Sequence, residues 1–215
     1  MNLLGVILST LGARRVSRRI ADASEFTAFA GREALYLAQK TTVEYCRARS
    51  GFNYEKLFKE AAFNTAFEVA RAEAYAACLS DVVLVAEARL RDAVPPGREA
   101  VFEAALQRSY ATALETLAPP GGDAARWHEA GVAFAIRLAR ARLASPRRPD
   151  EIARHGGRRL FESLPFDRTV VAHDGEMVVN SMRFAMVRLD GLVADEIDVA
   201  ALVADLCGER SGPPP

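Results

Sequence analysis

The stretch from Phe52 to Val94 constrains the fold most strongly, because it contains neither glycine nor proline and then meets Pro95-Pro96-Gly97. Both residue types disfavour helix interiors, so an uninterrupted stretch of this length predicts a helix. We expect the helix to run from Asn53, a candidate N-cap, to Ala93, with a length of about 60 Å. Apolar residues recur along it at three- and four-residue steps, which predicts that this helix forms the centre of the fold.

The same punctuation divides the rest of the chain into helices. Asp22 and Glu25 have the spacing of a capping box, and Asp123 is a candidate N-cap after a proline- and glycine-rich loop. The glycine pairs at 121–122 and 156–157 are interpreted as turns. The expected helices span 22–51, 53–93, 97–117, 123–143, 151–164, 175–189 and 196–206. This pattern predicts an all-α fold, a single bundle of about six to seven helices around one long central helix.

The segment around the Asp174-Gly175 pair is the most ambiguous part of the chain. An Asp-Gly pair between β-branched runs is typical of a hairpin. Against the hairpin, apolar residues recur at helical spacing from Val178 onward, and Asp174 could be the N-cap of that helix. We expect a short extended segment at residues 168–173 followed by a helix.

Composition excludes several classes of protein. Hydrophobic residues make up 50% of the chain, and 28 basic residues balance 28 acidic ones. This argues against a wholly disordered chain, a collagen-like chain and a multi-span membrane protein. Three widely spaced cysteines indicate a reducing compartment, so we expect a cytoplasmic protein. The bias towards alanine and arginine is compatible with a GC-rich genome, and we expect a bacterial protein. The expected organisation is an amphipathic segment at 1–20, a helical domain at 21–208 and a disordered tail at 209–215.

The N-terminal segment combines an apolar stripe with basic residues. Leucine and isoleucine recur at helical spacing up to Leu11, and the segment carries four arginines before the first acidic residue. Such a segment is typical of a helix that lies on an anionic membrane surface, here the inner face of the membrane, or binds a partner. The alternative is that the stripe covers the domain core and the arginines are merely solvated. The candidate binding residues are Leu4, Leu8, Arg14, Arg15, Arg18 and Arg19.

Charge is segregated along the chain. Between residues 126 and 160, nine arginines accompany three acidic residues, whereas the stretch from Asp174 onward has a net charge of −5. The basic part could bind an acidic protein or an anionic membrane, or the two parts could neutralise each other in the fold. Few aromatic residues accompany these arginines, which disfavours nucleic acid as a partner. The candidate surface residues are Arg140, Arg147, Arg148, Arg158 and Arg159.

No sequence motif points to catalysis, to a metal or to another cofactor. The chain lacks a Gly-x-Ser-x-Gly elbow, phosphate-binding glycine loops and a Glu-x-x-His pair. Glu151 and His155 share a helix face without completing a metal site. His173 and Asp174 form one local polar cluster, whose chemical role stays open beside the simpler interpretation as a turn.

Aromatic residues are concentrated between residues 26 and 75, where they could line a pocket for an apolar molecule such as a lipid, quinone or tetrapyrrole. The simpler interpretation is that they form part of the core. The candidate pocket residues are Tyr45, Phe58, Phe63, Phe67 and Tyr75.

The sequence therefore predicts a non-catalytic helical adaptor or assembly factor, which engages a protein partner or an anionic membrane through its N-terminal segment and its arginine-rich region. The alternative function is a carrier or sensor with an aromatic-lined pocket. Self-association into a homo-oligomer is compatible with either function.

Overall fold

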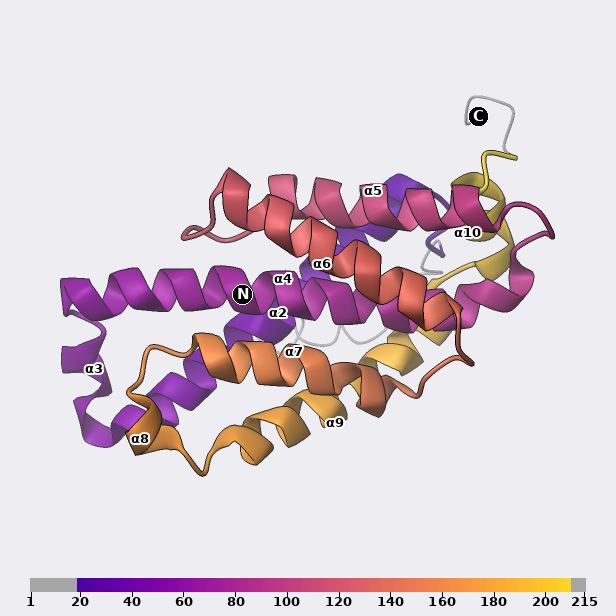
Figure 1. The fold of residues 1–215 in the computed structure, drawn as a ribbon. Helices are drawn as coiled ribbons and strands as arrows, with labels where there is room; N and C mark the ends of the chain where they lie inside the picture. Colours follow the sequence, from indigo (N-terminus) through magenta and orange to yellow (C-terminus); the bar gives the residue numbers. More distant parts are fainter. Residues whose placement is uncertain (1–18, 210–215) are drawn as a thin grey trace, which may run out of the picture.

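A computed structural model describes residues 19–209 of the chain (Figure 1). Seven helices of eight residues or more occupy this range, which contains no β-structure apart from one bridge between Ile20 and Ile197. The expected all-α class with six to seven helices is confirmed. The helices are α2 (Ala23–Ser50), α4 (Ala61–Leu90), α5 (Glu99–Leu117), α6 (Ala124–Arg142), α7 (Pro149–Ser163), α9 (Gly175–Glu196) and α10 (Val199–Leu206), with the short α3 (Tyr54–Leu57) and α8 (Arg168–Val171).

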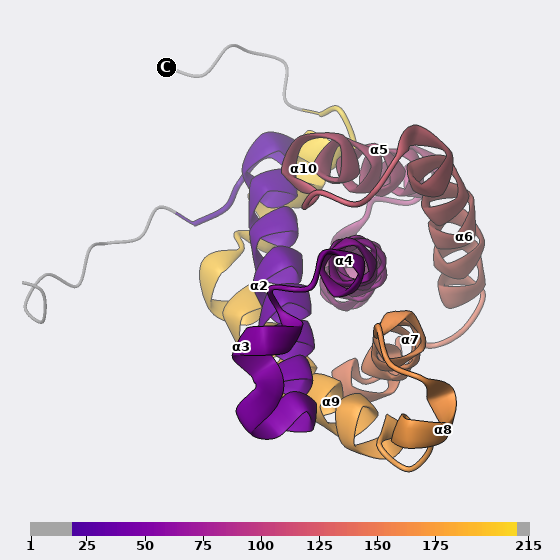
Figure 2. The ribbon, with the colours of Figure 1, turned by 90° about the vertical axis from the view of Figure 1, so that its left-hand side faces the viewer.

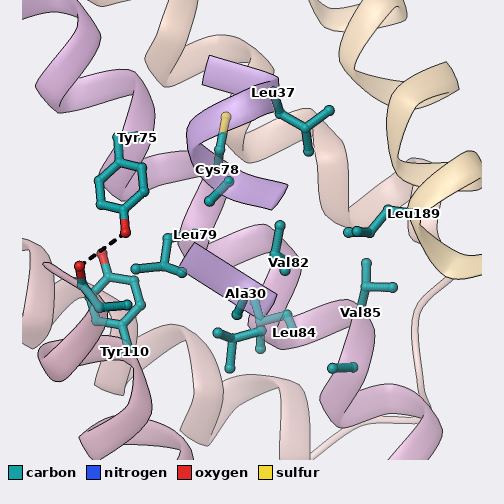
Figure 3. Close-up of a cluster of buried hydrophobic side chains, with 14 of the residues drawn as sticks. Ala30, Leu37, Tyr75, Cys78, Leu79, Val82, Leu84, Val85, Tyr110 and Leu189 are labelled. Atoms are coloured by element: carbon teal, nitrogen blue, oxygen red, sulfur yellow. Dashed lines mark hydrogen bonds between the residues drawn. The ribbon is translucent and has the colours of Figure 1, made fainter. Parts of the chain in front are cut away.

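Helix α4 occupies the centre of the bundle. Figure 2 shows it nearly end-on, with α2, α5, α6, α7 and α9 around it. Its second half is buried almost all round, from Ala74 to Glu87, and alanines there let neighbouring helices approach closely. Side chains from α2, α4, α5 and α9 meet in the core shown in Figure 3, where the labelled residues are Ala30, Leu37, Tyr75, Cys78, Leu79, Val82, Leu84, Val85, Tyr110 and Leu189.

Two tyrosines tie α4 to α5 within this core. The hydroxyl of Tyr75 donates to the carbonyl oxygen of Ala113, and that of Tyr110 donates to the carbonyl oxygen of Ala76, each over 3.0 Å. Both rings are almost completely buried. A buried tyrosine ring stabilises the fold by its apolar contacts only if its hydroxyl also has a hydrogen-bond partner. Here each helix provides a backbone carbonyl for the tyrosine of the other helix.

The expected single helix over 53–93 is wrong at its beginning. The chain leaves helical geometry after α3 and starts α4 at Ala61, and the side chain of Asn53 makes no capping bond. The Phe58 ring folds back onto Phe67, with ring centroids 5.0 Å apart. The Asn64 side-chain amide donates to the Phe58 carbonyl over 2.8 Å. Aromatic packing therefore outweighs the modest helix propensity of this stretch, which tertiary contacts commonly override.

The N-caps expected at Asp22 and Asp123 are confirmed. The Asp22 carboxylate accepts from the amide of Glu25 over 2.8 Å, and Asp123 accepts from the amide of Arg126 over the same distance. Each bond satisfies a backbone donor that the first helical turn would leave without a partner.

The expected extended segment at 168–173 is wrong, because α8 occupies most of it. The Asp167 side chain accepts from the amide of Thr169 and so starts this short helix. Asp174 does not cap α9 with its side chain, and its carboxylate accepts the Tyr45 hydroxyl of α2 over 2.7 Å instead. Helix α9 then continues to Glu196, beyond the expected end at residue 189. The last helix starts at Val199 rather than at 196, because the chain first forms the bridge at Ile197.

The turn expected at Gly156-Gly157 is also wrong, since both glycines lie inside α7. A Cβ atom on Gly156 would lie 2.3 Å from Oδ2 of Asp81 on α4. A Cβ atom on Gly157 would lie 2.9 Å from the Cα atom of Val179 on α9. The two glycines therefore let α7 approach a helix on each side, and this close packing, rather than a turn, is their function in the fold.

An arginine-lined cleft as candidate functional site

Helix α6 is attached to the bundle by few apolar side chains. Only Phe134 and Leu138 are buried among its residues, and the Phe134 ring stacks on Tyr110 of α5 with centroids 4.2 Å apart. Ion pairs of Arg126 and Arg137 also join α6 to α4. The space between α4, α6 and α7 is consequently crossed by charged side chains rather than filled by a packed core.

The central polar bridge joins Asp81 of α4 to Arg137 of α6. Nη2 of Arg137 lies 2.8 Å from Oδ1 of Asp81, and Nη1 of Arg137 donates to the hydroxyl of Ser80. The amide of Gly156 on α7 donates to Oδ2 of Asp81 over 2.9 Å. One buried carboxylate thereby links three helices, and both of its oxygens have a hydrogen-bond partner, as a buried charge requires.

Burial makes this carboxyl group a weaker acid. The Asp81 side chain is fully buried, and desolvation raises its pKa to about 6, against the opposing effects of the Arg137 charge and of hydrogen bonds from Arg137 and Gly156. The carboxylate is ionised at neutral pH. Protonation at mildly acidic pH would weaken its attraction for Arg137.

Two further polar bridges start from residues of α4 that lie seven positions before and seven positions after Ser80. Glu73 forms ion pairs with Arg126 of α6 and Arg159 of α7. At the other end, Glu87 pairs with Arg91 over 2.8 Å. Arg91 also donates to two carbonyl oxygens near the end of α6, those of Ala141 and Ala144. Positions 73, 80 and 87 share one face of α4, so the three bridges follow that face.

Two hollows lie between these bridges, and Arg137, His155 and Arg159 line both of them. The first has a volume of about 420 Å³, and its floor includes Ala76, Ala77 and Ser80. The second has a volume of about 510 Å³, and its floor includes Leu84 and Ala88. The second hollow, called the arginine cleft below, carries the larger excess of positive charge. It is lined by Leu84, Glu87, Ala88, Arg91, Arg137, Arg140, Ala141, Arg147, Glu151, Ile152, Arg154, His155, Arg158, Arg159 and Glu162.

Four arginines of the cleft have no carboxylate partner in the part of the chain that the structure describes. They are Arg140, Arg147, Arg154 and Arg158. Among the lining acids, Glu87 pairs with Arg91 and Glu162 with Arg159, so that only Glu151 is left to offset them. The cleft therefore has a positive potential that the described fold does not neutralise, and this is the condition for binding an anionic group.

The environment of the cleft lowers the pKa of His155. Its side chain lies exposed in the wall of α7, yet its pKa is lowered to about 4. The surrounding walls restrict the hydration of the imidazolium, and the charges of Arg137, Arg159 and Arg158 disfavour it further. The imidazole is thus neutral at physiological pH. An anion bound in the cleft would stabilise the protonated form and raise this pKa.

The structure brings most of the predicted arginine surface together. Arg140, Arg147, Arg158 and Arg159 all line the cleft. Arg148 does not, because it lies 74% exposed outside it and pairs with Asp150 over 2.9 Å. Arg19 is exposed on the chain leading to α2. The other predicted residues of the N-terminal segment lie outside the described residues, namely Leu4, Leu8, Arg14, Arg15 and Arg18.

The predicted aromatic pocket residues lie in two places. Phe58, Phe63 and Phe67 contact one another, and Tyr45 joins them through Phe166, whose ring centroid is 5.9 Å away. Tyr75 lies apart, hydrogen-bonded to α5. The first group fills the space between its members with aromatic contacts, as a core does. The pocket for an apolar molecule stays a prediction.

Sequence reasoning missed the buried ion pair and three basic residues of the cleft, Arg91, Arg154 and His155. A signal for the pair was present, because Ser80 and Asp81 interrupt an otherwise apolar run inside the central helix. A carboxylate in such a position is almost never buried without a partner. That partner is Arg137 of α6, which lies on another helix, so residue spacing within one helix cannot identify it.

Residues 19–209 contain neither a metal-binding cluster nor a membrane-spanning helix, and their cysteines are buried. No group of three or more histidine, cysteine, aspartate or glutamate side chains is arranged to hold a metal ion there. No helix in this range has both the length and the apolar composition needed to cross a membrane. The three cysteines are buried, and burial raises the pKa of the Cys46 thiol to about 12, so this thiol stays protonated.

No family model, curated protein or solved structure matches this chain. The geometry and charge of the arginine cleft are therefore the features that indicate a function for this chain.

Proposed function

We propose that this protein is a non-catalytic binding protein, an adaptor or assembly factor, that binds an acidic protein partner through the arginine cleft. The proposal is carried by one observation, the four cleft arginines that have no carboxylate partner within residues 19–209. Arginine presents a planar fork of donors that matches a carboxylate or phosphate, and is more weakly hydrated than lysine. Such side chains in a hollow are suited to take up acidic groups from another molecule.

The shape of the site favours a protein over a membrane as the partner. The free arginines come from both walls of a hollow, with Arg140 on α6 facing the α7 side that carries Arg154 and Arg158. A flexible or helical acidic segment can place side chains into such a hollow, whereas a planar surface reaches only its rim. The N-terminal segment would supply a second basic contact, to the same partner or to a membrane.

Binding of a fluorescent glutamate-rich peptide at low ionic strength tests the proposal. The variant R154Q/R158Q removes two exposed arginines that have no partner, without disturbing a described ion pair. We expect about tenfold weaker binding, since two exposed charge contacts of roughly 0.7 kcal/mol each amount to that factor.

The matched control is R32Q/R108Q, which removes the same charge from exposed arginines that lie outside the cleft and form no described ion pair. It should bind the peptide nearly as the unmodified protein does, and added salt should weaken binding in both. Equal losses in the two double variants would show non-specific attraction and contradict the proposal.

A further inference from the structure

The outer face of α6 carries an apolar stripe beside the arginine cleft. Val132, Ile136 and Leu143 expose 49%, 48% and 89% of their surface. They lie on one side of the helix together with Arg140, because the steps between the four residues are four, four and three. Arg140 also lines the cleft, so the stripe and the cleft meet at this residue.

This stripe is not what attaches α6 to the bundle. The inner face of α6 uses Phe134 and Leu138 for that purpose, and both are buried. Figure 2 shows α6 along an outer edge of the bundle, with no other helix of residues 19–209 beyond it. Apolar side chains gathered on one exposed face, next to unpaired charges, are typical of a protein-binding surface.

The charges around the stripe indicate what covers it. Arg140 lies within the stripe, and Arg147 follows its last residue, Leu143, by four positions, near the end of the connection to α7. Neither arginine has a carboxylate partner within residues 19–209. A binding element for this face must therefore present apolar side chains on one side and acidic side chains next to them.

We infer that the partner's binding element is an amphipathic helix, whose apolar side packs on Val132, Ile136 and Leu143 while its flanking acidic side chains pair with Arg140 and Arg147. This inference rests on the proposed function and specifies its partner. The stripe covers about 16 Å along α6, or three helical turns. A helix supplies apolar residues at the same three- and four-residue steps over that length, and this mode of recognition is common.

The test uses two synthetic helical peptides of identical composition. In the first, leucines form one face with glutamates on both sides of it, and in the second the leucines are distributed around the helix. The variant I136S/L143S removes the apolar stripe. The control variant F184S/V187S removes two equally accessible apolar residues of α9, which are 80% and 56% exposed.

We expect the first peptide to bind the unmodified protein and the α9 control equally, and to bind I136S/L143S at least about tenfold more weakly. The second peptide should bind more weakly than the first and be indifferent to I136S/L143S. Circular dichroism checks that each variant is folded. Equal binding of both peptides to all three proteins would overturn the inference.

The outcomes separate this inference from the proposed function. If R154Q/R158Q weakens binding of the first peptide while I136S/L143S does not, acidic recognition holds and the helical partner is wrong. If neither variant weakens it, the proposed function fails as well. Two further results would overturn the inference in favour of another occupant. The first is binding to phosphatidylserine vesicles that I136S/L143S weakens, which would indicate that a membrane covers the stripe. The second is a dimer in sedimentation that I136S/L143S abolishes, which would indicate that a second copy of this chain covers it.

Discussion

Arg137 of α6 and Asp81 of α4 form an ion pair in which the carboxylate is completely buried and the guanidinium is 19% exposed. Arg137 lines the arginine cleft and also pairs with a buried carboxylate of the central helix, so it belongs to both the fold and the candidate site. A charge buried this deeply is tolerated only with a partner. The position of α6, and with it the shape of the cleft, depends on this pair.

Removal of the carboxylate should therefore destabilise the protein. In D81A, Arg137 and the amide of Gly156 both lose their acceptor, and breaking a buried pair in this way costs roughly 3 kcal/mol. Urea denaturation measures the loss. E129A, which removes an exposed acid from the wall of the neighbouring hollow, should change the free energy of unfolding by less than about 0.5 kcal/mol. Similar small effects of both substitutions would contradict a structural role for the pair.

Asp81 and His155 should affect the pH dependence of stability in opposite directions. The pKa of Asp81 rises from 3.8 to about 6, so the folded protein binds this proton more tightly than the unfolded chain does. Its contribution to the free energy of unfolding is fully present below pH 3.8 and is lost as the pH rises to about 6. The pKa of His155 falls from 6.5 to about 4, so its contribution is present above pH 6.5 and is lost as the pH falls to about 4.

Single variants separate the two contributions. Relative to the unmodified protein, the stability of D81N should rise with pH between 4 and 6, because the falling contribution of Asp81 is gone. The stability of H155Q should fall relative to the unmodified protein over the same interval. Denaturant unfolding at several pH values measures both differences. Parallel curves for all three proteins would show that neither group titrates abnormally in the folded state.

The glycines of the helices should divide into two classes on substitution by alanine. G156A and G157A should be strongly destabilising, because their Cβ atoms would lie 2.3 Å from Asp81 and 2.9 Å from the backbone of Val179. G131A and G191A place a Cβ where no atom lies within 4 Å, and each should stabilise by about 0.5–1 kcal/mol. Thermal unfolding measures all four, and a common sign for the two classes would contradict the close packing of α7.

The parts of the fold that the sequence predicts are those determined locally. Asp22 and Asp123 cap their helices as expected, since a cap depends only on residues within one turn. Predictions failed where the local structure depends on contacts with residues that are distant in the sequence. Asp174 has the spacing of a cap, but its carboxylate accepts a hydrogen bond from the Tyr45 hydroxyl, far away in the sequence. Phe58 leaves a helix to pack on aromatic rings. The two adjacent glycines of α7 form a sequence pattern that is typical of a turn. Only their contacts with α4 and α9 show that they allow close packing of helices.

The candidate site was predictable in charge but not in shape. The excess of arginines between residues 126 and 160 is visible in the sequence. Which of them are neutralised is not visible, because the acids that pair with Arg126, Arg137 and Arg159 include Glu73 and Asp81 of α4. These pairings across helices leave a smaller set of free arginines, and only the fold identifies them.

The most direct test of the arginine cleft is the pKa of His155, measured by NMR with and without the glutamate-rich peptide. In the free protein the imidazole should stay neutral between pH 5 and 7, since its pKa is about 4. With saturating peptide, carboxylates in the cleft should raise this pKa so that protonation begins within that interval, while His173, outside the cleft, serves as the control. An unchanged His155 titration with bound peptide would show that acidic ligands bind elsewhere and would contradict the account.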